Sequence, residues 1–260
     1  GLTKRGVSAA AIYSGMSYSK IDITLDNASF GKTKLLYVSP ERIKTRLFRE
    51  RLKNMNVSLI AVDESHCISQ WGYDFRPSYL EISNLRELIG KNVPIIALTA
   101  TATPNVVDDI QDKLNFNAPL VMSKSFEREN LKYLVYQTED QLGSLVRFLK
   151  QNEGSGVVYA RSRRRTQEVA EVLRNSGISA DSYHAGLSSE QRSTKQDQWI
   201  AGETRVICAT NAFGMGIDKP DVRSVAHVDL PDTLEAYFQE AGRAGRDERP
   251  SSAICIVGTN

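Results

Sequence analysis

Short apolar runs alternate with longer amphipathic stretches along all 260 residues of the chain. Runs such as residues 58–62 and 156–159 are long enough for a buried strand and too short for a helix. Strands that alternate with amphipathic helices along a chain pair as parallel strands joined by crossover helices. The sequence therefore predicts an α/β fold with mostly parallel sheets.

The apolar runs fall into two sets, separated by a polar segment at residues 123–130. A chain of this length holds one large or two modest domains. We therefore predict a first domain over residues 1–122, a linker over 123–130 and a second domain over 131–260. The run at 119–122, just before the linker, is also strand-like. Predicted strands cover residues 7–12, 34–38, 58–62, 94–98, 133–137, 156–159, 180–183, 205–209, 224–228 and 253–257, and predicted helices cover residues 140–151, 165–175 and 189–201.

Composition excludes several classes of protein. The 33 basic and 31 acidic residues leave a formal net charge of +2, which excludes a long basic tail but not a local nucleic-acid-binding surface. The chain has no membrane-spanning apolar run and does not open on a signal segment, so we expect a cytoplasmic protein with no membrane partner. The scattered Cys67, Cys208 and Cys255 predict reduced thiols, and neither a disulfide framework nor a zinc site.

The predicted strand at residues 58–62 leads directly into Asp63, Glu64, Ser65 and His66. Ligands of open α/β sheets bind at the carboxyl ends of the strands. There an aspartate can hold Mg²⁺ against nucleotide phosphates, and a neighbouring glutamate can activate the attacking water. An acidic strand end that simply faces water would give the same pattern.

Near the carboxyl end of the chain, Gln239 is followed by Arg243 and Arg246 among small residues. A spacing of three residues is close to one helical turn, so two such arginines can reach one anionic group together. A guanidinium beside a γ-phosphate stabilises the charge of the transition state as an arginine finger. A solvated basic face is the alternative interpretation.

These segments resemble motifs of known enzymes. Residues 63–66 resemble the DExH motif of superfamily 2 helicases, and residues 239–246 resemble their motif VI. Residues 67–77 resemble the aromatic-rich loop that distinguishes the RecQ-type DNA helicases. Other segments resemble the family's motifs in the family's order: residues 37–43 (motif Ib), 98–103 (motif III), 157–163 (motif IV), 183–187 and 206–220 (motif V).

The resemblance implies two RecA-like domains, with ATP and Mg²⁺ as cofactors and single-stranded and partly duplex DNA as partners. It implies ATP-driven 3′ to 5′ movement along one strand, in a bacterial nucleoid or a eukaryotic nucleus. In this interpretation Asp63 coordinates Mg²⁺, Glu64 activates water and Arg246 is the finger. Arg243 and Gln239 would support the phosphate site across an interdomain cleft.

The aromatic-rich loop places Trp71, Phe75 and Arg76 next to the acidic residues. These side chains could sense DNA by base stacking or phosphate contact and then shift the nucleotide site. Core packing is the alternative for the aromatic residues. Tyr73 occupies a position where family members often carry histidine.

Hydroxyl groups follow the predicted strand at residues 94–98. Thr99 and Thr101 are suited to hydrogen-bond the acidic residues or His66, and so to couple hydrolysis to domain movement. Threonines in this segment could also cap the helix that follows, and both roles can hold.

In the second half, Thr210 and Asn211 follow a strand and precede a Gly-x-Gly segment, which can approach phosphates closely. Arg163 belongs to a basic run at the start of a predicted helix, where phosphate binds readily, and the resemblance gives this motif a DNA-backbone role. A solvated charged turn is the alternative. Arg161 stands where the family often has asparagine, and His184 is interpreted as a structural histidine.

No Gly-x-x-x-x-Gly-Lys-Ser/Thr loop occurs in the sequence, and the resemblance places that loop upstream of Gly1. We therefore expect a fragment that starts after this loop and ends after motif VI, with its first domain incomplete at the N-terminus. Alone it would bind nucleotide poorly and be inactive. The competing hypotheses are a non-catalytic nucleic-acid-binding protein on a helicase scaffold and an RNA-directed DExH enzyme.

Overall fold

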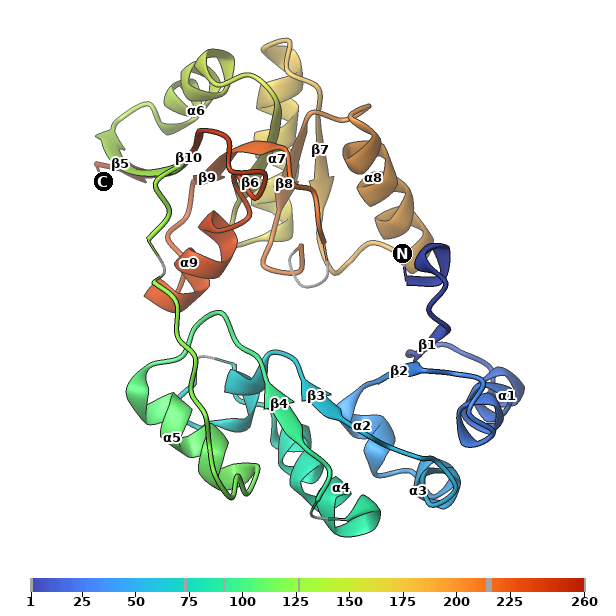
Figure 1. The fold of residues 1–260 in the computed structure, drawn as a ribbon. Helices are drawn as coiled ribbons and strands as arrows, with labels where there is room; N and C mark the ends of the chain where they lie inside the picture. The colour runs from blue at the N-terminus through green and yellow to red at the C-terminus, as the bar shows by residue number, and fades with distance from the viewer. Residues whose placement is uncertain (1, 73, 91, 126, 214–216, 260) are drawn as a thin grey trace. The chain divides into compact units, whose positions relative to one another are not determined.

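The computed structural model describes the chain except for residues 1, 73, 91, 126, 214–216 and 260 (Figure 1). Tyr73 of the aromatic-rich loop and the Gly-x-Gly segment of motif V therefore lie outside the described residues. The chain divides into two compact units, Gly1–Met122 (unit 1) and Ser123–Asn260 (unit 2). Among the described residues, no helix is long and apolar enough to cross a bilayer.

Unit 1 contains two separate pairs of parallel strands rather than one sheet. β1 (Ala9–Ile12) pairs with β2 (Leu35–Val38), and β3 (Ile60–Val62) pairs with β4 (Ile95–Ala97). All four strands were predicted from their apolar runs. The α-helices of unit 1 are α1 (Tyr18–Ser29), α2 (Pro40–Ile43), α3 (Arg46–Leu52), α4 (Glu81–Ile89) and α5 (Pro104–Lys113), and its 3₁₀ helices are η1 (Leu2–Arg5), η2 (Ser65–Ile68) and η3 (Pro77–Leu80).

The strand-like run at residues 119–122 does not form a strand, so that prediction was wrong. The side chains of Leu120 and Met122 are 78% and 85% exposed. An apolar run without a buried face gains too little from burial to hold a strand in place. Pro119 also lacks the N–H that a strand ladder needs.

The core of unit 1 joins both strand pairs to the helices beside them. Leu25 of α1, Ile68 of η2 and Leu114 at the end of α5 are fully buried in one apolar cluster. Val62, the last residue of β3, belongs to the same cluster and is 4% exposed. The strand that delivers Asp63 is therefore anchored by its own carboxyl-terminal residue.

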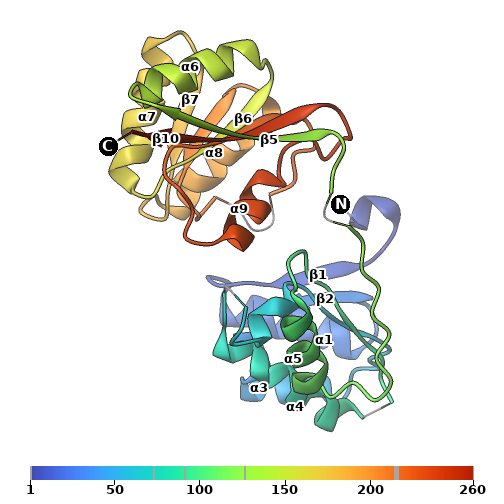
Figure 2. The ribbon, with the colours of Figure 1, turned by 90° about the vertical axis from the view of Figure 1, so that its left-hand side faces the viewer.

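Unit 2 is built on one sheet of six parallel strands in the order β5-β10-β9-β6-β8-β7. β5 and β10 run side by side over their whole length (Figure 2). All six strands and three of the four helices were predicted: α9 was not, and the capping box of Ser188 and Gln191 begins α8. The strands are β5 (Leu131–Thr138), β6 (Ser155–Tyr159), β7 (Ala180–Tyr183), β8 (Val206–Ala209), β9 (Val222–His227) and β10 (Ser251–Gly258), and the helices are α6 (Gln141–Gln151), α7 (Arg163–Asn175), α8 (Ser189–Ala201) and α9 (Leu234–Ala241).

Alternating residues of the central strands point to opposite faces of this sheet. Val158 of β6 packs in a cluster with α6 and α7, whereas Val157 and Tyr159 pack in a second cluster with α8 and α9. Strand side chains alternate with a period of two, so a strand that is apolar at every position needs helices on both faces. Because β6 pairs in parallel with β8 and β9, the carboxyl ends of these three strands lie at one edge of the sheet.

Trp199 of α8 is expected to carry much of the stability of unit 2. Its ring is 1% exposed, contacts Phe213 edge-on, and donates from Nε1 to the Gly156 carbonyl at 3.2 Å. Trp199→Ala is therefore expected to lower the free energy of unfolding by about 3–5 kcal/mol. Trp71 is 76% exposed, so Trp71→Ala is the matched control, with an expected change within about 0.5 kcal/mol. Urea unfolding followed by circular dichroism measures both, and equal losses would contradict the prediction.

Candidate active site

The acidic residues and the threonines predicted as coupling residues meet at the carboxyl edge of β3 and β4. Val62 lies opposite Ala97 in the parallel register. The Leu98 amide donates to the Val62 carbonyl at 2.8 Å, and the Ser65 amide donates to the Leu98 carbonyl at 2.9 Å. Parallel strands end at the same edge, so segments more than 30 residues apart become neighbours there.

His66 lies at the centre of this edge and is 1% exposed. Its Nδ1 is 3.1 Å from the Thr99 hydroxyl and 3.5 Å from Oε2 of Glu64. Burial lowers the pKa of His66, which favours the neutral ring at physiological pH. The Thr99 hydroxyl also accepts from the Thr101 amide at 3.2 Å. The alternative capping role is not seen, because Thr103 is the N-cap residue of α5 and makes no side-chain capping bond.

Glu64 adopts the left-handed backbone conformation, with φ of 48° and ψ of 43°. This conformation costs a residue with a Cβ about 1–2 kcal/mol. Such strain concentrates at functional sites, where the surrounding structure holds it in place. The adjacent Asp63 is exposed, its carboxylate accepts from the Glu64 amide at 2.9 Å, and its carbonyl accepts from the Tyr79 hydroxyl at 3.3 Å.

The aromatic-rich loop is attached to the backbone of η2. The Arg76 amide donates to the Cys67 carbonyl at 2.8 Å, and a Cβ added at Gly72 would lie 2.5 Å from the His66 carbonyl oxygen. The loop therefore packs directly on the segment that follows Glu64. Trp71 is 76% exposed, and Phe75 is half-buried.

Asp74 organises this loop, and sequence reasoning missed it. Its Oδ2 accepts from Nη2 and Nε of Arg76 at 2.6 and 3.1 Å and lies 3.8 Å from the Cys67 sulfur. Burial raises the pKa of the Cys67 thiol to about 11. The Asp-x-Arg spacing was the available signal, because a carboxylate two residues before an arginine can hold its guanidinium.

In unit 2, the segment with the paired arginines is a series of turns rather than a helix. α9 ends at Ala241, and the amides of Arg243 and Ala244 bond to carbonyls three residues back. Gly245 has a φ of +63°, and its amide donates to the Val222 carbonyl at 2.8 Å. The expected helical spacing of the two arginines was therefore wrong, because a left-handed glycine bonded to β9 cannot continue a helix.

The two arginines contact different parts of unit 2. Nη1 of Arg246 is 3.1 Å from Oδ1 of Asp218, a residue that sequence reasoning did not single out. The Arg246 side chain is 40% exposed. Burial raises the pKa of the Tyr159 phenol, and the nearby Arg243 guanidinium opposes that shift. Gln239 is partly exposed on the last turn of α9.

The residues predicted to contact DNA in unit 2 follow the carboxyl ends of β6 and β8. Arg163 is the first residue of α7 and is exposed, with Ser162 as the N-cap. Asn211 is exposed in the turn after β8, while the half-buried Thr210 accepts the Ala212 amide on its hydroxyl at 3.4 Å. A Cβ added at Gly186 would lie 2.7 Å from Nη1 of Arg163, so that guanidinium covers the loop after β7.

No group of three or more metal-ligating side chains occurs in the part of the chain that the structure describes. Mg²⁺ at nucleotide sites is held by one or two carboxylates together with phosphate oxygens and water. The exposed Asp63 carboxylate, at the carboxyl end of a strand, fits that mode of binding.

Comparisons with known proteins agree with this arrangement. Residues 2–110 match the DEAD/DEAH box helicase family, and residues 138–248 match the helicase conserved C-terminal domain. The chain is 42% identical to the ATP-dependent DNA helicase RecQ of Pasteurella multocida over 97% of its own length and 40% of the relative. It is 47% identical to the RecQ-like DNA helicase blm-1 of Caenorhabditis elegans over 86% of its own length and 24% of the relative. The chain belongs to the RecQ helicases.

Solved structures show the same fold for this RecQ chain. Mycobacterium smegmatis helicase Lhr, solved with single-stranded DNA and AMP-PNP, has a TM-score of 0.75 at 21% identity and covers 96% of the RecQ chain and 35% of its own. The DEAD-box helicase Mss116 has a TM-score of 0.79 at 15% identity, and the match covers 99% of the RecQ chain and 55% of the Mss116 chain. These likenesses identify a RecA-like helicase fold. The RecQ chain spans well under half of the length of the RecQ relatives described above.

Proposed function

We propose that the protein containing this RecQ chain is an ATP-dependent DNA helicase, which couples ATP hydrolysis to 3′ to 5′ translocation and to unwinding. One observation carries the proposal. The aromatic-rich loop with its exposed Trp71 is hydrogen-bonded to the backbone of η2, directly after Asp63 and Glu64. A base that stacks on the loop can therefore shift the acidic residues without a long-range pathway.

The proposed roles follow from where the side chains lie. Asp63 holds Mg²⁺, which when bound neutralises charge on the nucleotide phosphates. Glu64 orients and deprotonates the attacking water, and the surrounding structure holds it in its strained backbone conformation. His66, with the Thr99 hydroxyl and the Thr101 amide that donates to it, transmits the state of this edge to the neighbouring strand.

Unit 2 supplies cationic and DNA-binding side chains in this proposal. Arg246 acts as the arginine finger, and Arg243 with Gln239 supports the phosphate site. The DNA contacts are proposed for Trp71, Phe75 and Arg76 in unit 1 and for Arg163, Thr210 and Asn211 in unit 2. The proposed partners are single-stranded and partly duplex DNA, in a nucleoid or a nucleus.

ATP turnover with single-stranded DNA or RNA as the added polymer tests the proposal. The sequence has no Gly-x-x-x-x-Gly-Lys-Ser/Thr loop, so the protein is assayed as its own gene encodes it. Stimulation by DNA and not by RNA is expected. Equal stimulation would favour an RNA-directed enzyme, and nucleic-acid binding without turnover would overturn the proposed activity.

Trp71→Ala is expected to weaken binding of single-stranded DNA. Loss of one stacked base costs about 1–3 kcal/mol, which corresponds to roughly 5- to 150-fold in affinity. Phe30→Ala is the matched control, because Phe30 is 77% exposed in unit 1 and lies outside the loop. Fluorescence anisotropy of a labelled oligonucleotide measures both variants. Equal affinity of Trp71→Ala and the unchanged protein would remove Trp71 from the DNA site.

A further inference from the structure

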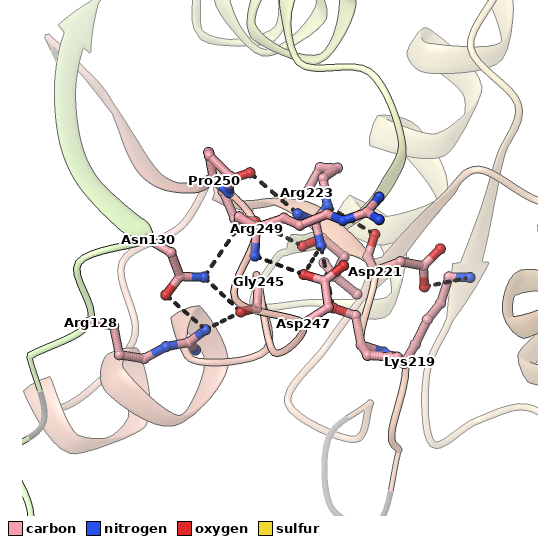
Figure 3. Close-up of polar contacts among 12 residues, drawn as sticks. Arg128, Asn130, Lys219, Asp221, Arg223, Gly245, Asp247, Arg249 and Pro250 are labelled. Carbon is pink, nitrogen blue, oxygen red and sulfur yellow. Dashed lines mark hydrogen bonds and ion pairs between the residues drawn. The ribbon is translucent and has the colours of Figure 1, made fainter.

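We infer that Arg128 and Asn130 are positioning residues for the arginines of motif VI. Both lie in the segment before β5, more than 110 residues from motif VI in the sequence. Figure 3 shows both side chains directed at the turn that contains Gly245. The inference rests on the proposed function, in which Arg243 and Arg246 act on the nucleotide.

Arg128 donates hydrogen bonds to two backbone carbonyls of the turn. Its Nη1 donates to the Gly242 carbonyl at 3.1 Å, and its Nη2 donates to the Gly245 carbonyl. These are the carbonyls that immediately precede Arg243 and Arg246. A guanidinium has donors in a fixed fork, so it can hold two carbonyls at a set separation, which a lysine ammonium cannot do.

Asn130 bonds to the same turn from beside Arg128. Its Nδ2 donates to the Gly245 carbonyl at 2.7 Å and to the Arg249 carbonyl at 3.0 Å, and its own carbonyl accepts the Ser251 amide at 2.8 Å. Residues on both sides of Arg246 are thereby tied to one amide side chain. Asn130 also anchors the register in which β5 meets β10.

The turn leaves no room for a side chain at Gly245. A Cβ added at Gly245 would lie 2.6 Å from Nδ2 of Asn130 and 3.0 Å from the Arg249 carbonyl. On the opposite side, Arg223 pairs with Asp247 at 2.5 Å and donates to the Pro250 carbonyl at 3.3 Å (Figure 3). The backbone that presents Arg246 is therefore held from both sides, while the Arg246 side chain remains partly exposed.

The tests are Arg128→Lys, which keeps the charge but loses the fork that spans the Gly242 and Gly245 carbonyls, and Asn130→Asp, which keeps the shape but loses the amide donor. We expect each to lower kcat for DNA-stimulated ATP hydrolysis by roughly 10- to 100-fold, because a displacement of about 1 Å in a catalytic group has an effect of that size. KM for ATP should change less than the turnover does. An unchanged kcat in both variants would overturn the inference, whatever their change in stability.

Arg205→Ala is the matched control for a merely structural role. Arg205 also holds backbone carbonyls of unit 2, at Gly154 and Asn152, each at 2.9 Å, but none in motif VI. It should lower the urea midpoint as much as Arg128→Ala does and leave kcat nearly unchanged. A loss of kcat equal to that of Arg128→Ala would mean that general stability, and not positioning, controls the rate.

A double-mutant cycle separates this inference from the proposed function. If Arg128 acts through Arg246, then Arg128→Ala should cause little further loss of kcat in an Arg246→Ala background. Additive losses would overturn the positioning role of Arg128. If Arg246→Ala alone leaves turnover unchanged, the proposed finger is wrong, whereas a large effect of Arg246→Ala with none of Arg128→Lys rejects only this inference.

Discussion

Arg246→Ala is expected to lower the ATP turnover of the RecQ protein by roughly 10³-fold, the magnitude typical of an arginine finger. The guanidinium stabilises charge that develops on the transferred phosphoryl group, and alanine has no group to replace it. In the structure the side chain is held by Asp218 at 3.1 Å and is 40% exposed. An exposed ion pair of this kind contributes about 0–1 kcal/mol, so phosphate can displace Asp218 with little cost.

DNA affinity is the internal control for Arg246→Ala and should be largely retained. Arg249→Ala is the matched substitution, because Arg249 is an exposed arginine three residues further along the same segment. It should leave turnover within a few-fold of the unchanged protein. Steady-state ATP hydrolysis with saturating single-stranded DNA measures both variants. Unchanged turnover in Arg246→Ala would remove the residue from the catalytic group.

Glu64→Gln is expected to lower ATP hydrolysis by about 10²- to 10⁴-fold, the contribution of a positioned general base. Glutamine keeps the shape of the side chain and its hydrogen bonds but cannot accept a proton from water. Nucleotide affinity should be retained, because phosphate binding does not require this carboxylate. Single-turnover hydrolysis and equilibrium binding of labelled ATP give the two measurements separately.

Two further variants test whether the effect of Glu64→Gln is chemical. Glu87→Gln changes an exposed glutamate of α4 in the same unit and should leave hydrolysis unchanged. Glu64→Gly removes the carboxylate and so should abolish hydrolysis, and because glycine carries no cost for the left-handed backbone it should add up to about 1–2 kcal/mol of stability. Retained hydrolysis in Glu64→Gln would assign the base to another residue.

The six strands of unit 2 and three of its helices, α6, α7 and α8, were predictable because each is encoded locally. Runs of consecutive apolar residues identified strands buried on both faces. Candidate site residues such as Asp63 and Thr210 were found for the same reason, since each follows directly after a strand. The turn at Arg243 and Arg246 was missed, because the bond from Gly245 to Val222 joins two segments that no local pattern connects.

The sequence alone determined the α/β class, the positions of the paired strands and the candidate residues Asp63, Glu64 and His66, because periodicity and motif spacing act over a few neighbouring residues. Only the tertiary structure decided that Thr99 meets His66, that Asp218 holds Arg246 and that Asp74 organises the aromatic-rich loop. It also decided that Arg128 and Asn130 bond to carbonyls more than 110 residues away. Such pairs depend on which strands become neighbours and where their ends meet, and that choice is made by packing of the whole unit.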